Sequence, residues 1–108
     1  MITIQEYLDV TGTSVFARWF DALNTQAALK VNTYLIRIEN GNFSRVKSVG
    51  SGVHECRIDF GPGYRVYFGK DGDNLIILLG GGTKKRQQKD IEHAKELWLK
   101  YKRRKKEN

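Results

Sequence analysis

The chain has 108 residues, 40% of them hydrophobic, which is enough for a single domain over residues 1–108 with an apolar core. Its one cysteine, Cys56, excludes an intramolecular disulfide and a zinc site built from paired cysteines. The first residues lack the pattern of a secretory signal, and the longest aliphatic run, Leu75 to Leu79, is too short to span a bilayer; we therefore expect a cytoplasmic protein without membrane contact.

The net charge of +7 is unevenly distributed along the chain. Residues 1–44 carry three basic and four acidic side chains, whereas residues 45–108 carry sixteen basic and eight acidic ones. A basic half on a globular domain attracts polyanions, of which nucleic acid is the most common, and an acidic protein is the rival partner. The basic run 100–106, taken alone, fits a solubilising tail equally well.

The first half of the chain predicts a strand followed by two helices. Ile2 and Ile4 alternate with polar neighbours, which indicates a short opening strand. Residues 15–23 place their apolar side chains on one helical face, with Thr13 or Ser14 as the capping hydroxyl. A second stretch with the same period starts after Asn24-Thr25 and ends at Asn40-Gly41. We expect the two helices to form a hairpin.

After Gly41 the hydrophobic period changes to two residues, which is typical of strands. Residues 53–60 predict a strand with one solvent-facing side, on which Glu55 and Arg57 lie opposite His54 and Cys56. Residues 64–68 predict the returning strand and residues 75–79 a third, so that the three form an antiparallel meander. Residues from about 91 to 101 return to helical spacing, and we expect the basic end, about 102–108, to be frayed.

The sequence contains no P-loop, no GxSxG and no HExxH motif, so we expect neither a bound cofactor nor a metal. Residues 83–89 place four cations at the start of a helix, where cations oppose the helix dipole, and this favours an anionic ligand over a merely solvated surface. Arg57 and Arg65 lie on adjacent strands and can clamp one phosphate; equally, Arg57 can pair locally with Glu55 or Asp59.

Several segments, in this order, resemble the RelE-like superfamily of bacterial toxins, specifically the branch of addiction-module killer proteins close to the HigB-like toxins. They are Trp19 to Leu23, Arg37 to Phe43, Gly52 to Ile58, Gly61 to Phe68, Leu78 to Lys84, and Gln87 with Asp90, Ile91 and Ala94. The resemblance covers nearly the whole chain. It implies an α+β fold in which an N-terminal helical hairpin packs on a twisted antiparallel sheet with a C-terminal helix.

The resemblance also implies a function. Toxins of this kind enter the ribosomal A site and cut mRNA there without a metal, and their partner is a cognate antitoxin, here expected to be a HigA-like helix-turn-helix protein. By position, Arg65 and Lys84 stabilise the transition state and Arg57 is a second phosphate ligand. The RNA backbone would be held by Lys47, Lys85, Arg86 and Lys89.

The identity of the proton-transfer groups stays open, because Asp90 stands where the best-known members of the superfamily have a tyrosine or histidine. Asp90 is either a general base or an acidic residue that matches the helix dipole. Arg65 and Lys84 are expected on a solvent-facing side or loop, so their replacement by alanine is expected to change stability little.

Two hypotheses that assign the chain to other functional classes stay open. One is a non-catalytic RNA-binding module that uses the basic half together with Tyr67 on the sheet. The other is an interaction protein whose basic surface only meets an acidic partner.

Overall fold

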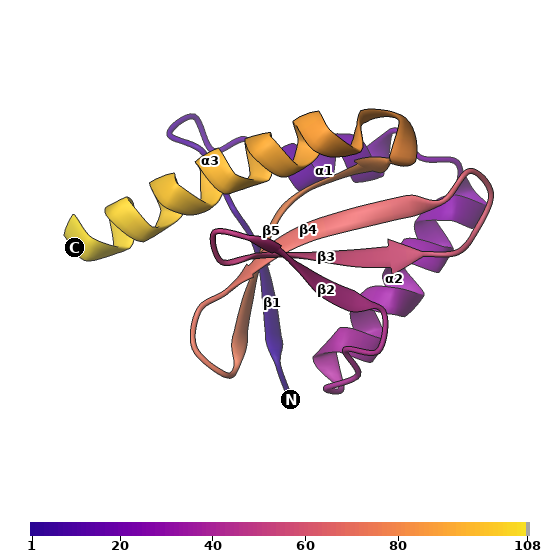
Figure 1. The fold of residues 1–108 in the computed structure, drawn as a ribbon, viewed down its shortest axis with the longest axis horizontal. Coiled ribbons are helices and arrows are strands. Elements are labelled where there is room, and N and C mark those ends of the chain that lie inside the picture. The colour runs from indigo at the N-terminus through magenta and orange to yellow at the C-terminus, as the bar shows by residue number, and fades with distance from the viewer. Residues whose placement is uncertain (108) are drawn as a thin grey trace.

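The computed structural model describes residues 1–107, which form an α+β fold (Figure 1). In chain order the elements are β1 (Thr3–Glu6), α1 (Val15–Asp21), α2 (Thr25–Glu39), β2 (Val46–Gly50), β3 (Val53–Ile58), β4 (Tyr64–Lys70), β5 (Leu75–Thr83), the 3-10 turn η1 (Lys84–Arg86) and α3 (Gln87–Glu107). No helix among these residues is long and apolar enough to cross a membrane.

The five strands form one mixed sheet in the order β1-β5-β4-β3-β2. The predicted antiparallel meander of β3, β4 and β5 is confirmed, but the expectation of a purely antiparallel sheet is wrong, because β1 pairs with β5 in parallel. Strand β2 was not predicted: it has only the two half-buried valines of Val-Lys-Ser-Val-Gly, and its strand character comes from pairing with β3. Strand β1 has only four residues, and so short a segment does not indicate whether its partner strand runs parallel or antiparallel to it.

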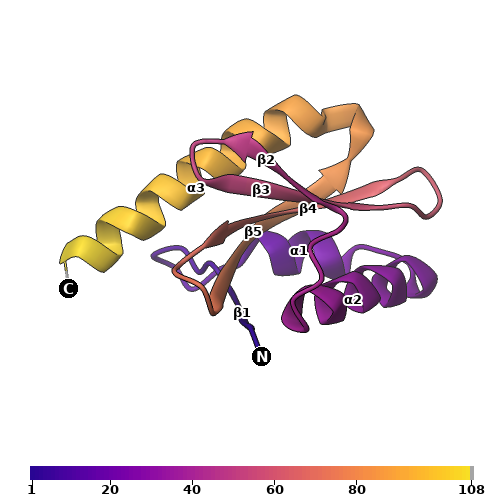
Figure 2. The same ribbon diagram turned by 60° about the horizontal axis from the view of Figure 1, so that its bottom comes forward.

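Helices α1 and α2 cover one face of the sheet (Figure 2). The Ser14 hydroxyl caps α1 by accepting a hydrogen bond from the Ala17 amide at 2.9 Å, which decides between the two predicted caps. Asn24 caps α2 in the same way through the Ala27 amide. Apolar side chains from both helices bury against Cys56, Val66 and Phe68 of the sheet; they include Phe16, Ala27, Val31 and Ile38.

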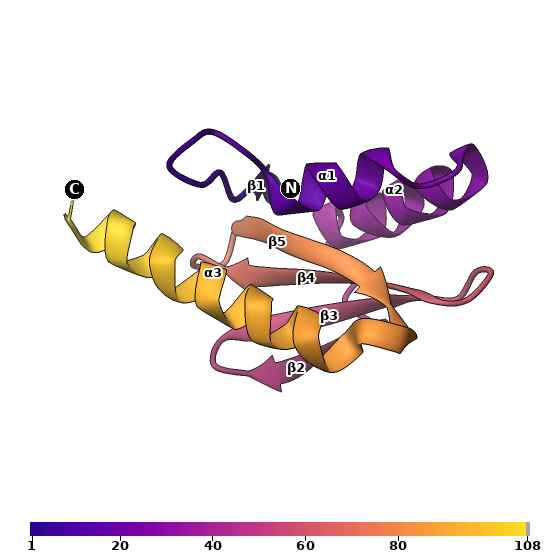
Figure 3. The same cartoon turned by 90° about the horizontal axis from the view of Figure 1, so that it is seen from above.

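Helix α3 covers the opposite face of the sheet (Figure 3). Its buried side chains, Ile91, Ala94, Leu97 and Trp98, pack against Val53, Tyr67 and Ile77. The expectation that one side of β3 faces solvent is therefore wrong, because Val53 is fully buried and Glu55 is 1% exposed. The alternation in the sequence shows which side chains share a face of the strand, whereas only the packing of the helices decides whether that face is covered.

The basic end of α3 is helical through Glu107, so the frayed end expected for residues 102–107 is wrong; Asn108 lies outside the described residues. Arg104 donates to the Leu8 carbonyl at 2.7 Å and to the Tyr7 hydroxyl at 3.0 Å. Lys105 pairs with Asp71 in the turn between β4 and β5. These contacts hold a helix end that has little apolar surface of its own.

Candidate functional site

The residues predicted to handle phosphate meet at one end of the sheet. Arg57 on β3 lies directly opposite Arg65 on β4, and Arg65 lies opposite Gly82 on β5. Thr83 ends β5 one residue later and Lys84 follows it in η1. Arg57, Arg65 and the turn that carries Lys84 therefore share the end of the sheet where the chain passes from β5 into α3 (Figure 1).

The remaining predicted cations surround that end on exposed positions. The Lys47 and Arg57 side chains are 68% and 57% exposed. Exposed cations also come from η1 and the first turn of α3, namely Lys84, Lys85, Arg86 and Lys89. The Arg57 Nε lies 3.4 Å from the Asp59 carboxylate, which also pairs with Arg45. The local pairing weighed for Arg57 is thus present with Asp59, at an exposed site where such pairs are weak.

Arg65 is the exception among these cations, because its side chain is only 10% exposed. The solvent-facing position expected for it is wrong: it lies beneath the start of α3. Its Nε is 3.7 Å from the Glu55 carboxylate and has no hydrogen-bond partner of its own. A guanidinium has five N–H donors, so the Glu55 contact leaves the terminal donors for another acceptor.

Glu55 connects four elements around this site. It lies on β3 with 1% exposure, and Lys47 on β2 approaches its Oε1 at 3.8 Å. Its Oε2 accepts a 2.9 Å hydrogen bond from Gln87 at the start of α3 and faces Arg65 on β4. Sequence reasoning missed Glu55 and Gln87 as site residues, because they are separated by 32 positions and only the packing of α3 brings them together.

Tyr67 lies next to this carboxylate and is fully buried. Burial, followed by the negative charge of Glu55, raises the pKa of the Tyr67 hydroxyl, which has no hydrogen-bond partner. A buried ring offers no face to a nucleotide base, so Tyr67 does not contribute a surface to the RNA-binding module considered above.

Asp90 lies in the first turn of α3, over the glycine that pairs with Arg65. A Cβ added at Gly82 would collide with the Asp90 carboxylate, so the missing side chain makes room for it. Burial raises the pKa of Asp90 against the opposing charges of Arg86 and His93. A raised pKa brings a carboxyl closer to the range useful for proton transfer.

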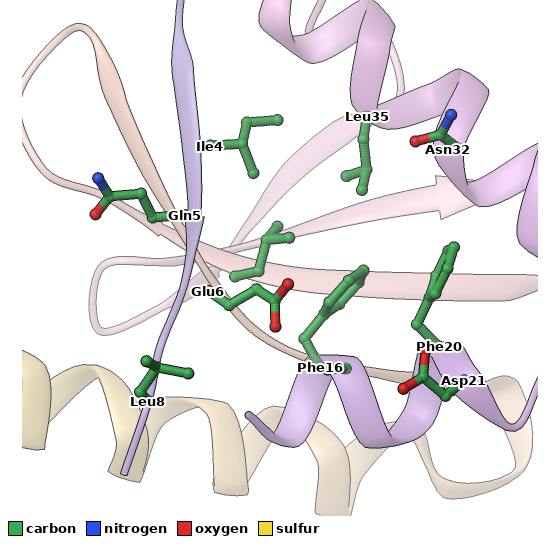
Figure 4. Close-up of a pocket in the computed structure, with 11 residues that line it drawn as sticks. Ile4, Gln5, Glu6, Leu8, Phe16, Phe20, Asp21, Asn32 and Leu35 are labelled. Carbon is green, nitrogen blue, oxygen red and sulfur yellow. The ribbon is translucent and has the colours of Figure 1, made fainter. Parts of the chain in front are cut away.

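Two other titratable groups and a groove belong to the opposite side of the sheet. The His54 ring is half-buried and stacks on Phe68 with 5.5 Å between ring centroids, and burial raises the pKa of the Cys56 thiol to about 11. A groove of about 810 Å³ lies between β1 and helices α1 and α2 (Figure 4). Two carboxylates, Glu6 and Asp21, line it, and none of its lining residues within 1–107 is a lysine or arginine.

A relative supports the description of this chain as one member of a protein family. An uncharacterized protein of Haemophilus influenzae is 44% identical over 91 residues, which cover 83% of this chain and 92% of the relative. This chain belongs to the same family as that protein. A scan against protein-family models found no match.

Proposed function

We propose that this chain is a RelE-like toxin of a bacterial toxin–antitoxin system, an endoribonuclease that cuts mRNA in the ribosomal A site. The observation that carries the proposal is the convergence of Arg57, Arg65 and the Lys84 turn at one end of the sheet. The α+β architecture, with two helices on one sheet face and α3 on the other, is compatible with the fold of such toxins.

The reaction requires little besides proton transfer and charge stabilisation. The 2′-hydroxyl oxygen of the RNA bonds to the adjacent phosphorus while the bond from phosphorus to the 5′-oxygen breaks. The products are a 2′,3′-cyclic phosphate and a free 5′-hydroxyl. One proton leaves the 2′-hydroxyl and another reaches the 5′-oxygen.

The roles follow from where each side chain lies. Arg65, poised beneath α3, and exposed Lys84 would stabilise charge on the phosphorane, and Arg57 would hold a second phosphate oxygen. Lys47, Lys85, Arg86 and Lys89 would hold the RNA backbone. Asp90 is the candidate for proton transfer, because its carboxyl has a raised pKa and lies over Gly82, the residue that pairs with Arg65.

Induced expression in a bacterium tests the proposal. We expect growth arrest and mRNA cleavage within coding regions that are being translated, whereas naked RNA is cut poorly. Mapping of 5′ ends after induction locates the cuts. The Arg65→Ala/Lys84→Ala double variant is the inactive reference. Normal growth with intact transcripts at confirmed soluble expression would contradict the enzymatic function.

The same proposal includes a cognate antitoxin, expected to be a HigA-like helix-turn-helix protein from a neighbouring gene. It would neutralise the toxin by covering the basic end of the sheet or by keeping the toxin out of the A site. Co-expression should restore growth and yield a stable complex. Failure of every neighbouring product to do so would remove this part of the proposal.

The exposed cations alone also fit a second function, which is binding of RNA or of an acidic protein without cleavage. Cleavage products separate the two functions. A chain that binds RNA at low salt and leaves ribosome-bound mRNA intact is a binding protein; one that does neither but retains an acidic partner is an interaction protein.

A further inference from the structure

We propose that Glu55 is a positioning residue that fixes both the Arg65 guanidinium and the start of α3. This inference rests on the proposed function and names a residue that the family resemblance did not. Its basis is one buried carboxylate, 1% exposed, that contacts Arg65 at 3.7 Å, Gln87 at 2.9 Å and Lys47 at 3.8 Å. These partners come from β4, α3 and β2 respectively.

A carboxylate in this position is costly to the fold, because burial removes it from water and an apolar side chain of similar size would pack there without that cost. Its neighbours on the same sheet face, Val53 and Tyr67, belong to the apolar core beneath α3. Glu55 therefore does more than fill space. What its charge does is determined by the groups that face it: the buried Arg65 guanidinium, the exposed Lys47 ammonium and the Gln87 amide of the helix itself.

The first effect concerns the direction of the Arg65 side chain. Arginine is long and flexible, and a free guanidinium loses rotamer entropy when it binds phosphate. The Glu55 carboxylate faces Nε, so the guanidinium is oriented before any RNA arrives. Charge stabilisation by an oriented group costs no reorganisation during the reaction.

The second effect concerns the cations of η1 and α3. The hydrogen bond from Gln87 ties the first residue of α3 to β3, directly after Lys84, Lys85 and Arg86. These four residues are otherwise exposed or half-exposed, and like charges in one turn repel one another. Glu55 thus holds the arginine on the sheet and the lysines on the helix turn in one fixed relation.

Glu55→Gln tests this role, because it keeps the shape of the side chain and an oxygen for Gln87 but removes the charge. We expect kcat for ribosome-bound mRNA to fall about ten- to a hundredfold, as for lost supporting contacts elsewhere. KM should stay within about twofold, because the exposed cations that bind the backbone are unchanged. Glu96→Gln, an exposed change on α3, is the matched control and should leave both constants unchanged.

Two readouts independent of activity accompany the kinetics. In the wild-type protein the Arg65 Nε–H should exchange with solvent at least about tenfold more slowly than those of exposed Arg18 and Arg103, and Glu55→Gln should remove that difference. Gln87→Ala should keep the slow Arg65 exchange but accelerate amide exchange over residues 84–90. This second variant keeps the inference testable if Glu55→Gln does not fold.

The outcomes separate the inference from the proposed function. Unchanged Arg65 exchange in Glu55→Gln, or faster Arg65 exchange with an unchanged kcat, would overturn the positioning role. If exchange responds as expected while the wild-type chain cuts no mRNA, Glu55 still fixes Arg65 and the proposed function is the part that fails.

Discussion

Arg65 combines a place in the core with a proposed place at the phosphate. Because its side chain is 10% exposed and faces a fully buried carboxylate, Arg65→Ala removes one half of a buried ion pair. We expect the free energy of unfolding to fall by about 3 kcal/mol, because the buried Glu55 charge then keeps only the Gln87 amide and the exposed Lys47 as partners. Urea denaturation measures this. A change below about half a kcal/mol would be typical of an exposed position and would contradict the buried geometry.

Lys84 offers the cleaner test of catalysis, because it is exposed and no ion pair is formed by it within residues 1–107. Lys84→Ala should leave the free energy of unfolding within about half a kcal/mol of wild type. Single-turnover cleavage of ribosome-bound mRNA should slow about a hundred- to a thousandfold, as when a donor to developing charge is removed. A variant that cuts at the wild-type rate would remove Lys84 from the site.

At the scale of elements, α3 and the sheet meet through a tryptophan lying on glycine. The Trp98 ring is 5% exposed and occupies the space where a Cβ of Gly69 would stand. Gly69→Ala should therefore destabilise the protein by about 1–3 kcal/mol through overpacking. Thermal or urea unfolding checks this. The cost should shrink in a Trp98→Leu background, since the two changes share one contact, and equal costs in both backgrounds would show that the ring is not the obstacle.

The end of α3 depends on the charge of Asp71. Hydrogen bonds from Lys105 and, next, from Tyr101 hold the pKa of this carboxyl below its ordinary value of 3.8. Since the folded-state pKa is the lower one, this contribution is present above pH 3.8 and is lost as the pH falls through the folded-state pKa.

We expect the Cα chemical shifts of residues 101–107 to lose helical character on acidification in the wild-type protein. In Asp71→Asn the same shifts should be reduced at neutral pH and should respond less to acid. Helical shifts that are equal in both proteins at pH 7 would show that the contact does not hold the helix end.

At the scale of the whole molecule, the exposed cations should set the strength and salt dependence of RNA binding. Lys85→Ala and Lys89→Ala each remove one contact to the RNA backbone, so each should make the negative slope of log K against log salt shallower by about 0.7. The bound RNA should still be cut at nearly the wild-type single-turnover rate. Arg18→Ala, on α1 across the sheet, is the control and should leave the slope unchanged. Equal slopes in all three variants would place the RNA elsewhere.

The sequence by itself determined the elements whose signals are local. Side-chain periodicity and capping residues predicted α1, α2 and the meander of β3, β4 and β5, because spacing along the chain is the property that a helix or strand repeats. The same alternation predicted that Arg57 and Arg65 lie on adjacent strands, and the pairing confirms it. The position of Lys84 at a helix start was predicted in the same way.

Only the tertiary structure decided what depends on contacts between distant segments. Strand β2 exists through its pairing with β3, and the parallel direction of β1 is decided by its pairing with β5, about seventy residues further along the chain. The burial of Glu55 and Arg65 follows from α3 packing on that face, since alternation gives two faces and does not say which one is covered. The link between Gln87 and Glu55 joins residues 32 positions apart, a distance at which no local pattern operates.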